Sequence, residues 1–146
     1  MIEPVTIRSA FQEGQDIFTK ARPVDADGAV IYSGVVNRVE LRVFDMSSAD
    51  PTSPVFYQDS EEAGTTVAIT TVFKTSLYLT GWGVDETGWS FKHQMPSALL
   101  DPDGEGRPEY GTIGGHRYKL EYKCAHNTDG LFYIVHLAHC KSLSSV

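Results

Sequence analysis

Four residues near the C-terminal end are of the types that bind zinc: Cys124, His126, His136 and Cys140. Zinc needs its ligands at roughly 2.0 to 2.3 Å, so all four would have to converge on one point. The surrounding residues instead predict a β-hairpin that turns between Thr128 and Asp129. Cys124 then lies opposite Tyr133, and Cys140 lies opposite Arg117. The two cysteines are therefore roughly 23 Å apart along the ladder. We therefore expect no metal and no disulfide here, and two buried free thiols.

The other residues that could take part in catalysis or metal binding have no catalytic or metal-binding partner that the sequence identifies. The same hairpin places His136 opposite Glu121, which is an ordinary cross-strand pair. His93 and His116 lie near glycines, where each suits an interface as readily as a reaction. The carboxylates of residues 101–105 resemble the opening of a calcium loop but lack the downstream acidic ligand. We expect a polar turn there, and solvated loops at the acid pairs Glu61-Glu62 and Asp85-Glu86.

No nucleophile elbow, zinc-protease helix motif or phosphate-binding glycine loop occurs in the sequence. We therefore expect a protein that is not an enzyme, with no catalytic residue and no cofactor. The segment with the most recognition potential contains Trp82, Trp89 and Phe91 between glycines. These rings suit a stacking platform for sugars, and equally a core or a subunit contact, since tryptophan concentrates in interface hot spots. Core or interface is the favoured interpretation.

The elements that must position these residues are mainly strands. Residues 1–12, which include Pro4, predict an N-terminal arm that is ordered only if another element holds it. A strand within residues 15–24 precedes a tight turn at Asp25 to Gly28, and residues 36–44 alternate cleanly between apolar and charged side chains. Residues 55–57 and 65–78 add further strands. Helix signals are nearly absent.

Two C-terminal segments complete this pattern. Residues 81–115 predict a structured excursion, because two tryptophans, glycines and prolines interrupt any long period. Residues 117–124 then alternate apolar and charged side chains, whereas residues 131–138 are apolar on both faces. About seven strands separated by turns predict an all-β sandwich over residues 13–146. The second face of the last strand must be covered by the excursion or by a neighbouring copy.

Composition limits the possible partners. The chain has 146 residues, enough for one domain, and a net charge of −7 from 12 basic and 19 acidic residues. This balance predicts no nucleic-acid binding, because Arg117, Lys119 and Lys123 alternate with apolar residues and share their face with Glu121. No apolar window approaches the length of a membrane span, so we expect no membrane partner and a soluble protein made in cytoplasm.

Several segments together resemble a known family. Residues 11–16 leading into Asp25-Ala26-Asp27-Gly28, then residues 39–45, are similar to the start of immunoglobulin-like β-sandwich domains in tailed-phage virion proteins. The N-terminal domain of baseplate upper proteins is one example. Residues 117–122, the Thr128-Asp129-Gly130 turn and residues 134–136 resemble the closing hairpin of such domains. The excursion from Trp82 to Pro96 departs from that pattern.

The resemblance implies a non-enzymatic virion component that works by protein–protein assembly. The expected role is a capsid decoration or cement protein that stabilises the head, with a baseplate, neck or tail component as the alternative. A carbohydrate-binding module is the alternative from another class. The expected partners are further copies of the chain, with a trimer possible, and the major capsid protein or tail and baseplate proteins. The expected interface residues are Trp82, Trp89, Phe91, Leu131, Tyr133, Val135 and Leu137.

Overall fold

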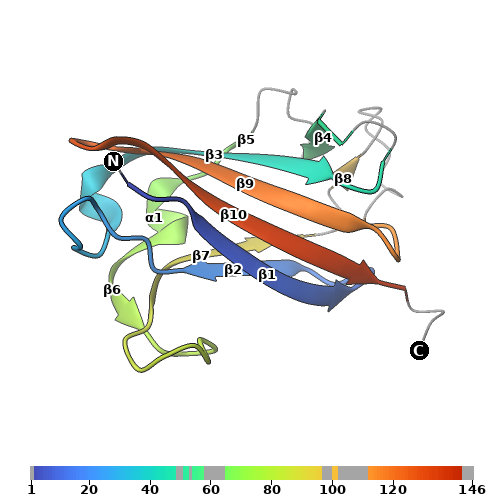
Figure 1. The fold of residues 1–146 in the computed structure, drawn as a ribbon, viewed down its shortest axis with the longest axis horizontal. Helices are drawn as coiled ribbons and strands as arrows, with labels where there is room; N and C mark the ends of the chain where they lie inside the picture. Colours follow the sequence, from blue (N-terminus) through green and yellow to red (C-terminus); the bar gives the residue numbers. More distant parts are fainter. Residues whose placement is uncertain are drawn as a thin grey trace.

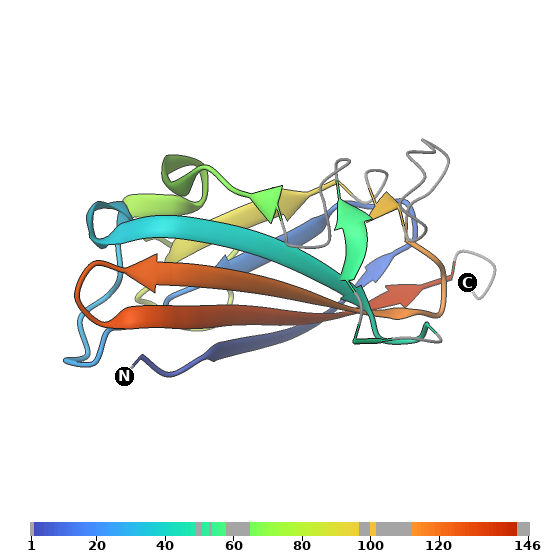
Figure 2. The same ribbon diagram turned by 90° about the horizontal axis from the view of Figure 1, so that it is seen from above.

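The computed structural model describes residues 2–48, 51–52, 54–57, 65–96, 100–101 and 112–142, and these residues form two β-sheets. Figures 1 and 2 show the sheets as two layers, with very little helix. The all-β prediction is confirmed. The acid pair Glu61-Glu62 and most of the calcium-like stretch 101–105 lie outside the described residues.

The larger sheet has the strand order β1, β10, β9, β3, β4, β8, with β5 also pairing with β3. Its strands are β1 Val5–Gln12, β3 Val36–Asp45, β4 Pro54–Tyr57, β5 Thr65–Thr66, β8 Leu100–Asp101, β9 Arg117–His126 and β10 Gly130–Lys141. The smaller sheet has the order β2, β7, β6. Its strands are β2 Ile17–Ala21, β6 Phe73–Tyr78 and β7 Trp89–Met95. Two short helical turns, η1 Ser33–Val35 and α1 Ile69–Val72, complete the described elements.

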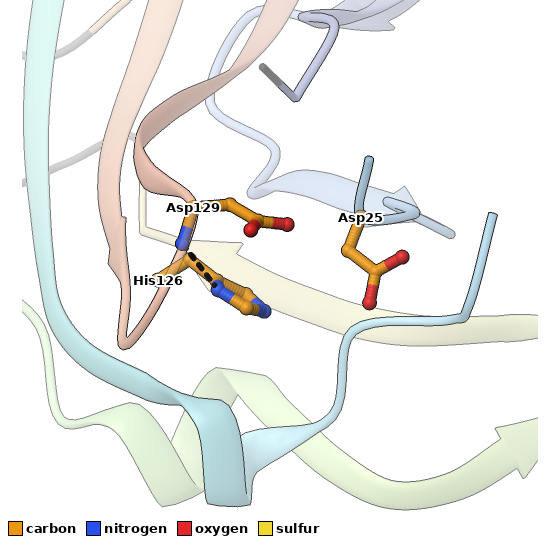
Figure 3. Close-up of side chains that lie close together, drawn as sticks. All are labelled: Asp25, His126 and Asp129. Atoms are coloured by element: carbon orange, nitrogen blue, oxygen red, sulfur yellow. Dashed lines mark hydrogen bonds between the residues drawn. The ribbon is translucent and has the colours of Figure 1, made fainter. Parts of the chain in front are cut away.

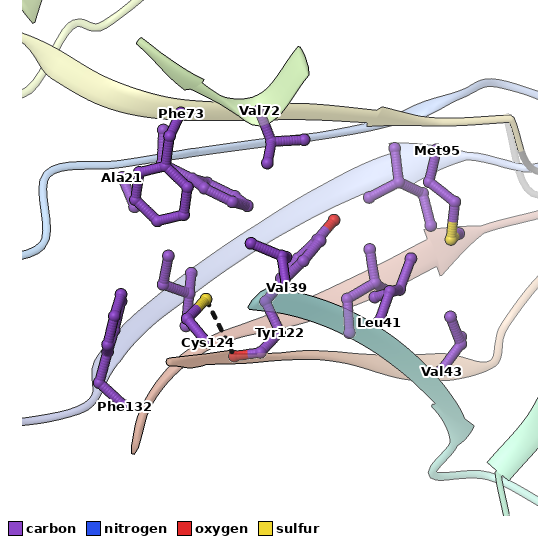
Figure 4. Close-up of a cluster of buried hydrophobic side chains, with 14 of the residues drawn as sticks. Ala21, Val39, Leu41, Val43, Val72, Phe73, Met95, Tyr122, Cys124 and Phe132 are labelled. Atoms are coloured by element: carbon purple, nitrogen blue, oxygen red, sulfur yellow. Dashed lines mark hydrogen bonds between the residues drawn. The ribbon is translucent and has the colours of Figure 1, made fainter. Parts of the chain in front are cut away.

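The core lies between the sheets and follows the period-two alternation of the strands. The strand predicted over residues 36–44 is confirmed as β3, and its inward residues include Val39, Leu41 and Val43. Aromatic rings connect the layers, since Phe91 of β7 packs edge-on against Phe73 and against Tyr122 of β9 at centroid distances of 5.1 and 5.0 Å. Figure 4 shows Phe73 and Tyr122 among the buried side chains of the core. Such pairs add to the free energy gained by burying their surface.

The closing hairpin forms as predicted, but its predicted register is wrong by one residue. Cys124 pairs with Phe132, and His136 pairs with Leu120 rather than with Glu121. The turn has three residues, 127–129, followed by Gly130 with a φ of 83°, in place of the predicted two-residue turn. A three-residue loop with glycine in the left-handed region is a common hairpin connection, and it moves every pairing by one position.

The structure also places the two segments predicted at the margins of the sandwich. Most of the predicted arm is β1, which pairs in parallel with β10 from Val5 to Gln12 and is held by it. The predicted excursion 81–115 contains β7, the central strand of the smaller sheet. The prediction of no regular strand there is wrong, because the tryptophan and glycines that obscure the period lie at the start of β7 and before it.

Both cysteines are buried free thiols, as predicted. In the described part of the chain, no helix is long and apolar enough to cross a membrane.

Candidate functional site

The outer face of the larger sheet carries a row of apolar side chains along β10. Leu131, Tyr133, Val135 and Leu137 alternate with the buried residues of that strand, and we call them the apolar row. Leu131 is 53% exposed, and the other three are partly buried. The opposite face of β10 packs against the smaller sheet. The strand that the excursion contributes, β7, belongs to the smaller sheet and so lies on the buried side of β10, not over the apolar row.

Basic side chains surround the apolar row. The register places Lys123, Glu121 and Lys119 of β9 directly beside Tyr133, Val135 and Leu137. Strand β3 pairs with β9 and strand β1 pairs with β10, so the outward side chains of both strands extend the same face. Over the strands β1, β10, β9 and β3, this alternation places on the outer face two acidic residues, Glu40 and Glu121, and seven basic residues: Arg8, Arg38, Arg42, Arg117, Lys119, Lys123 and Lys141.

The charge of this face is opposite to that of the whole chain. The four strands β1, β10, β9 and β3 place seven basic residues but only two acidic residues on it. Sequence reasoning missed this patch, because the basic residues come from four strands and each strand alone reads as a solvated face. Arg38 forms an ion pair with Glu40, and Lys119 lies 3.9 Å from Glu121. Ion pairs at the protein surface contribute little stability, so these two pairs would cost little to exchange for contacts with a partner.

Two hollows lie on this face. The first, of about 340 Å³, is lined by Arg38, Arg42, Lys123 and Leu131 among others. The second, of about 220 Å³, is lined by Arg8, Arg117, His139, Leu137 and Met46 together with backbone neighbours, and we call it the notch. Both combine cationic groups with apolar carbon, which suits a carboxylate beside an apolar side chain.

The loop after β3 fixes one wall of the notch. The Met46 N–H donates a hydrogen bond to the carbonyl of Arg117 at 2.7 Å, and the Arg117 N–H donates to Ser47 Oγ at 3.0 Å. Asp45, which is buried, lies 2.7 Å from Nδ1 of His116. This accounts for His116: it anchors a loop through Asp45.

The tryptophan segment is tied to the protein's own strands. Trp89 is only 5% exposed, stacks on Tyr78 at 5.1 Å, and its indole N–H donates to the carbonyl of Thr80. Phe91 lies in the core between the sheets. Of the three aromatic candidates in this segment, only Trp82 presents a partly exposed ring.

A charged pair holds the loop that carries Trp82. The Trp82 indole N–H donates to Asp85 at 2.8 Å, and Arg22 of the chain after β2 forms two hydrogen bonds to the same carboxylate at 2.9 and 2.7 Å. The Arg22 guanidinium holds the pKa of Asp85 well below its usual range, with help from Trp82. Asp85 therefore acts as a loop anchor, and the expectation of a merely solvated acid pair is incomplete.

His136 belongs to a chain of hydrogen bonds between the sheets. Its Nε2 lies 2.5 Å from Ser9 Oγ of β1, and its Nδ1 lies 2.7 Å from Thr19 Oγ1 of β2. Tyr122 continues the chain, 3.5 Å from Thr19 and 2.7 Å from Nδ1 of His93. The structure thus brings together two histidines that the sequence left unrelated, through a threonine and a tyrosine on other strands.

This network satisfies buried polar groups and is a poor catalytic apparatus. A serine beside an imidazole resembles a nucleophile and its base. Burial, however, lowers the pKa of His136 to about 4, so the ring accepts a proton weakly at neutral pH. Its second nitrogen faces the Thr19 hydroxyl rather than a carboxylate that would stabilise an imidazolium. Burial also lowers the pKa of His93 to about 4.

Asp25, His126 and Asp129 form a cluster that sequence reasoning did not find (Figure 3). One ligand atom from each lies within 4.8 Å of the others, which is compatible with a metal ion. The backbone N–H groups of Thr128 and Asp129 both donate to Nδ1 of His126, at 3.2 and 3.0 Å. Nδ1 is therefore the unprotonated nitrogen of the neutral ring, and Nε2 keeps its hydrogen. Such a ring donates to carboxylates and has no free nitrogen lone pair for a metal.

The comparisons with known proteins give no relative: no family model, no curated protein and no solved structure matches this chain.

Proposed function

We propose that the chain is a non-enzymatic structural protein of a tailed-phage virion that works by protein–protein assembly. An immunoglobulin-like sandwich is part of this proposal. It is supported by the parallel pairing of the first strand with the last and by the division into a β10–β9–β3 layer and a β2–β7–β6 layer. Antibody-like sandwiches divide their strands between two such layers.

The observation that carries the proposal is the apolar row on β10. A strand with apolar side chains on both faces has one face in the core and the other on the surface. Exposed apolar side chains that line up and are rimmed by charged residues are typical of protein-binding surfaces. The row and its basic rim have the composition of a docking surface, and the buried network around His136 offers no competing catalytic site.

Within this class we favour a capsid decoration protein, on the resemblance noted above. Many copies attached to a closed, symmetric lattice turn weak single contacts into strong overall attachment. The apolar row and its rim would contact the major capsid protein or a neighbouring copy. A baseplate, neck or tail component would use the same surface against a different partner.

Immunogold labelling of particles from the organism that encodes the chain tests the proposal. Label on heads supports decoration, label on tails supports the alternative, and complete absence from particles would overturn both. The docking surface is tested by Leu131→Asp, which should abolish attachment to particles. Phe18→Asp is a matched control, because Phe18 is 49% exposed, similar to Leu131, but lies on the smaller sheet. Equal loss with both variants would count against the apolar row.

A further inference from the structure

The notch carries positive charge that no carboxylate of the described residues pairs with. In the described part of the chain, Arg8 and Arg117 form no ion pair with any carboxylate. Both are exposed residues, and the register sets them on either side of the C-terminal half of β10, beside Leu137 and His139. Two guanidinium groups around one hollow suit a carboxylate ligand, since arginine binds carboxylates with paired hydrogen bonds.

Unneutralised negative charge lies at the other end of the same strands. Asp25, Asp27 and Asp129 surround the β9–β10 turn and the neighbouring loop, and none of them forms an ion pair with lysine or arginine in the described residues. Asp27 is exposed. The β9–β10 turn lies at one end of the hairpin, and the C-terminal end of β10 lies at the other (Figure 1). Leu137 and His139, near that C-terminal end, line the notch. Ten residues of β10 separate Asp129 from His139, or roughly 33 Å at 3.3 Å per residue.

We propose that the notch docks a second copy of this chain head to tail, by receiving the carboxylates at that copy's β9–β10 turn end. The argument for this occupant is charge complementarity between the two ends of one molecule. Docking two notch faces against each other would oppose like charges, because the described residues of β1, β10, β9 and β3 place seven basic and two acidic residues on each face, and this is unfavourable. Leu137 and Met46 supply apolar contact area beside the paired charges.

A head-to-tail contact uses different surfaces on the two partners, so copies assemble into a closed ring or an open filament according to the rotation between them. A ring would accord with the expected trimer. This inference rests on the proposed function in assuming that the protein acts by assembly. The contact itself can be measured on the purified protein alone.

The experiment uses sedimentation velocity on the purified protein and two variants. Arg117→Glu disables the notch, and Asp27→Lys disables the turn end without removing a side-chain hydrogen-bond acceptor that the loop uses, since only the Asp27 N–H is engaged. Each variant alone should associate roughly tenfold more weakly or worse than the wild type. High salt should weaken the wild-type contact as well, because salt screens exposed charges.

Mixing the two variants gives the decisive result. Asp27→Lys copies keep an intact notch and Arg117→Glu copies keep an intact turn end, so these two surfaces should pair in the mixture and restore association that neither variant shows alone. Lys20→Glu on the smaller sheet is the control for a charge reversal, and it should assemble like the wild type. Circular dichroism of each variant checks that it is folded.

Three outcomes would overturn the inference: a wild-type protein that stays monomeric at low salt and high concentration, an Arg117→Glu variant that assembles normally, or a mixture that remains monomeric. These outcomes are independent of immunogold labelling. A protein that self-associates yet is absent from particles would refute the proposed function alone, whereas a particle-bound protein that does not self-associate would refute the notch contact alone.

Discussion

Acid should destabilise the protein through the buried His136 and the partly buried His93. In the folded protein burial lowers the pKa of His136 and of His93 to about 4, whereas an unfolded histidine has a pKa of about 6.5. Above both values each ring is neutral in both states. As the pH falls from about 6.5 towards 4, the unfolded chain takes up protons that the folded protein excludes, so the free energy of unfolding decreases. Below about 4 the contribution levels off.

The size of the effect follows from the two pKa values. A shift of about 2.5 pH units corresponds to about 3 kcal/mol per histidine over the full range, and to about 2 kcal/mol between pH 7 and about pH 5. Both histidines together should therefore remove about 4 kcal/mol by about pH 5, a large fraction of the stability of a small domain. Urea titrations at the two pH values, followed by tryptophan fluorescence, measure the change. This window lies above the usual titration range of carboxylates.

Two variants separate the titration from the hydrogen bonds. His136→Gln should reduce the pH-dependent loss by about half, whatever its stability at neutral pH. Thr19→Val removes the Nδ1 partner of His136 but keeps the imidazole, so it should cost about 1 kcal/mol at neutral pH and leave a clear pH-dependent loss. A wild-type free energy of unfolding that is equal at the two pH values would refute the reasoning about burial.

Three further predictions concern other parts of the sandwich. Gly88→Ala should destabilise the protein by about 3 kcal/mol in urea titrations, because φ is +104° and the new Cβ would overlap the carbonyl of Tyr78. Gly28→Ala is the control: φ is +85° but the space around it is open, so the free energy of unfolding should fall by only about 1 kcal/mol. Cys124 should react with Ellman's reagent only after denaturation, since burial raises the pKa of its thiol to about 12; fast labelling of the native protein would contradict this. Excess zinc should not bind at the Asp25, His126 and Asp129 cluster, because Nδ1 of His126 already accepts two backbone N–H groups, so the melting temperature of the protein should stay unchanged. A rise in melting temperature that Asp129→Asn abolishes would show that the tautomer assignment is wrong.

Local alternation was enough to predict the strands with one wet face. β3 and β9 carry charged residues outward and apolar residues inward, and both were found from that pattern alone. The same criterion missed β7, because a strand in the middle of the smaller sheet carries Trp89, Ser90 and Phe91 in succession, all buried, and so shows no alternation at its start. Burial on both sides removes the period that sequence reasoning depends on.

The register of the closing hairpin shows a second limit. Both faces of β10 are apolar, with Phe132, Ile134 and Ala138 on one and the apolar row on the other, so either register pairs apolar residues of β9 with apolar residues of β10. Only the length of the turn distinguishes the two, and the three-residue loop before Gly130 places His136 inside and Val135 outside. One extra loop residue thus decides which side chains of β10 form the outward-facing apolar row.

The sequence by itself determined an all-β chain, a C-terminal hairpin, free thiols and the absence of a recognisable catalytic motif, because each of these depends on residue types and spacings within one or two neighbouring segments. Tertiary structure alone decided the basic outer face, the notch and the Ser9–His136–Thr19 network. Their members come from strands that are distant in the sequence, from β1 to β10, and become neighbours only through pairing and layering. The net charge of a surface and the hydrogen-bond partners of a buried histidine both depend on residues from several strands. No single segment of the sequence contains that information.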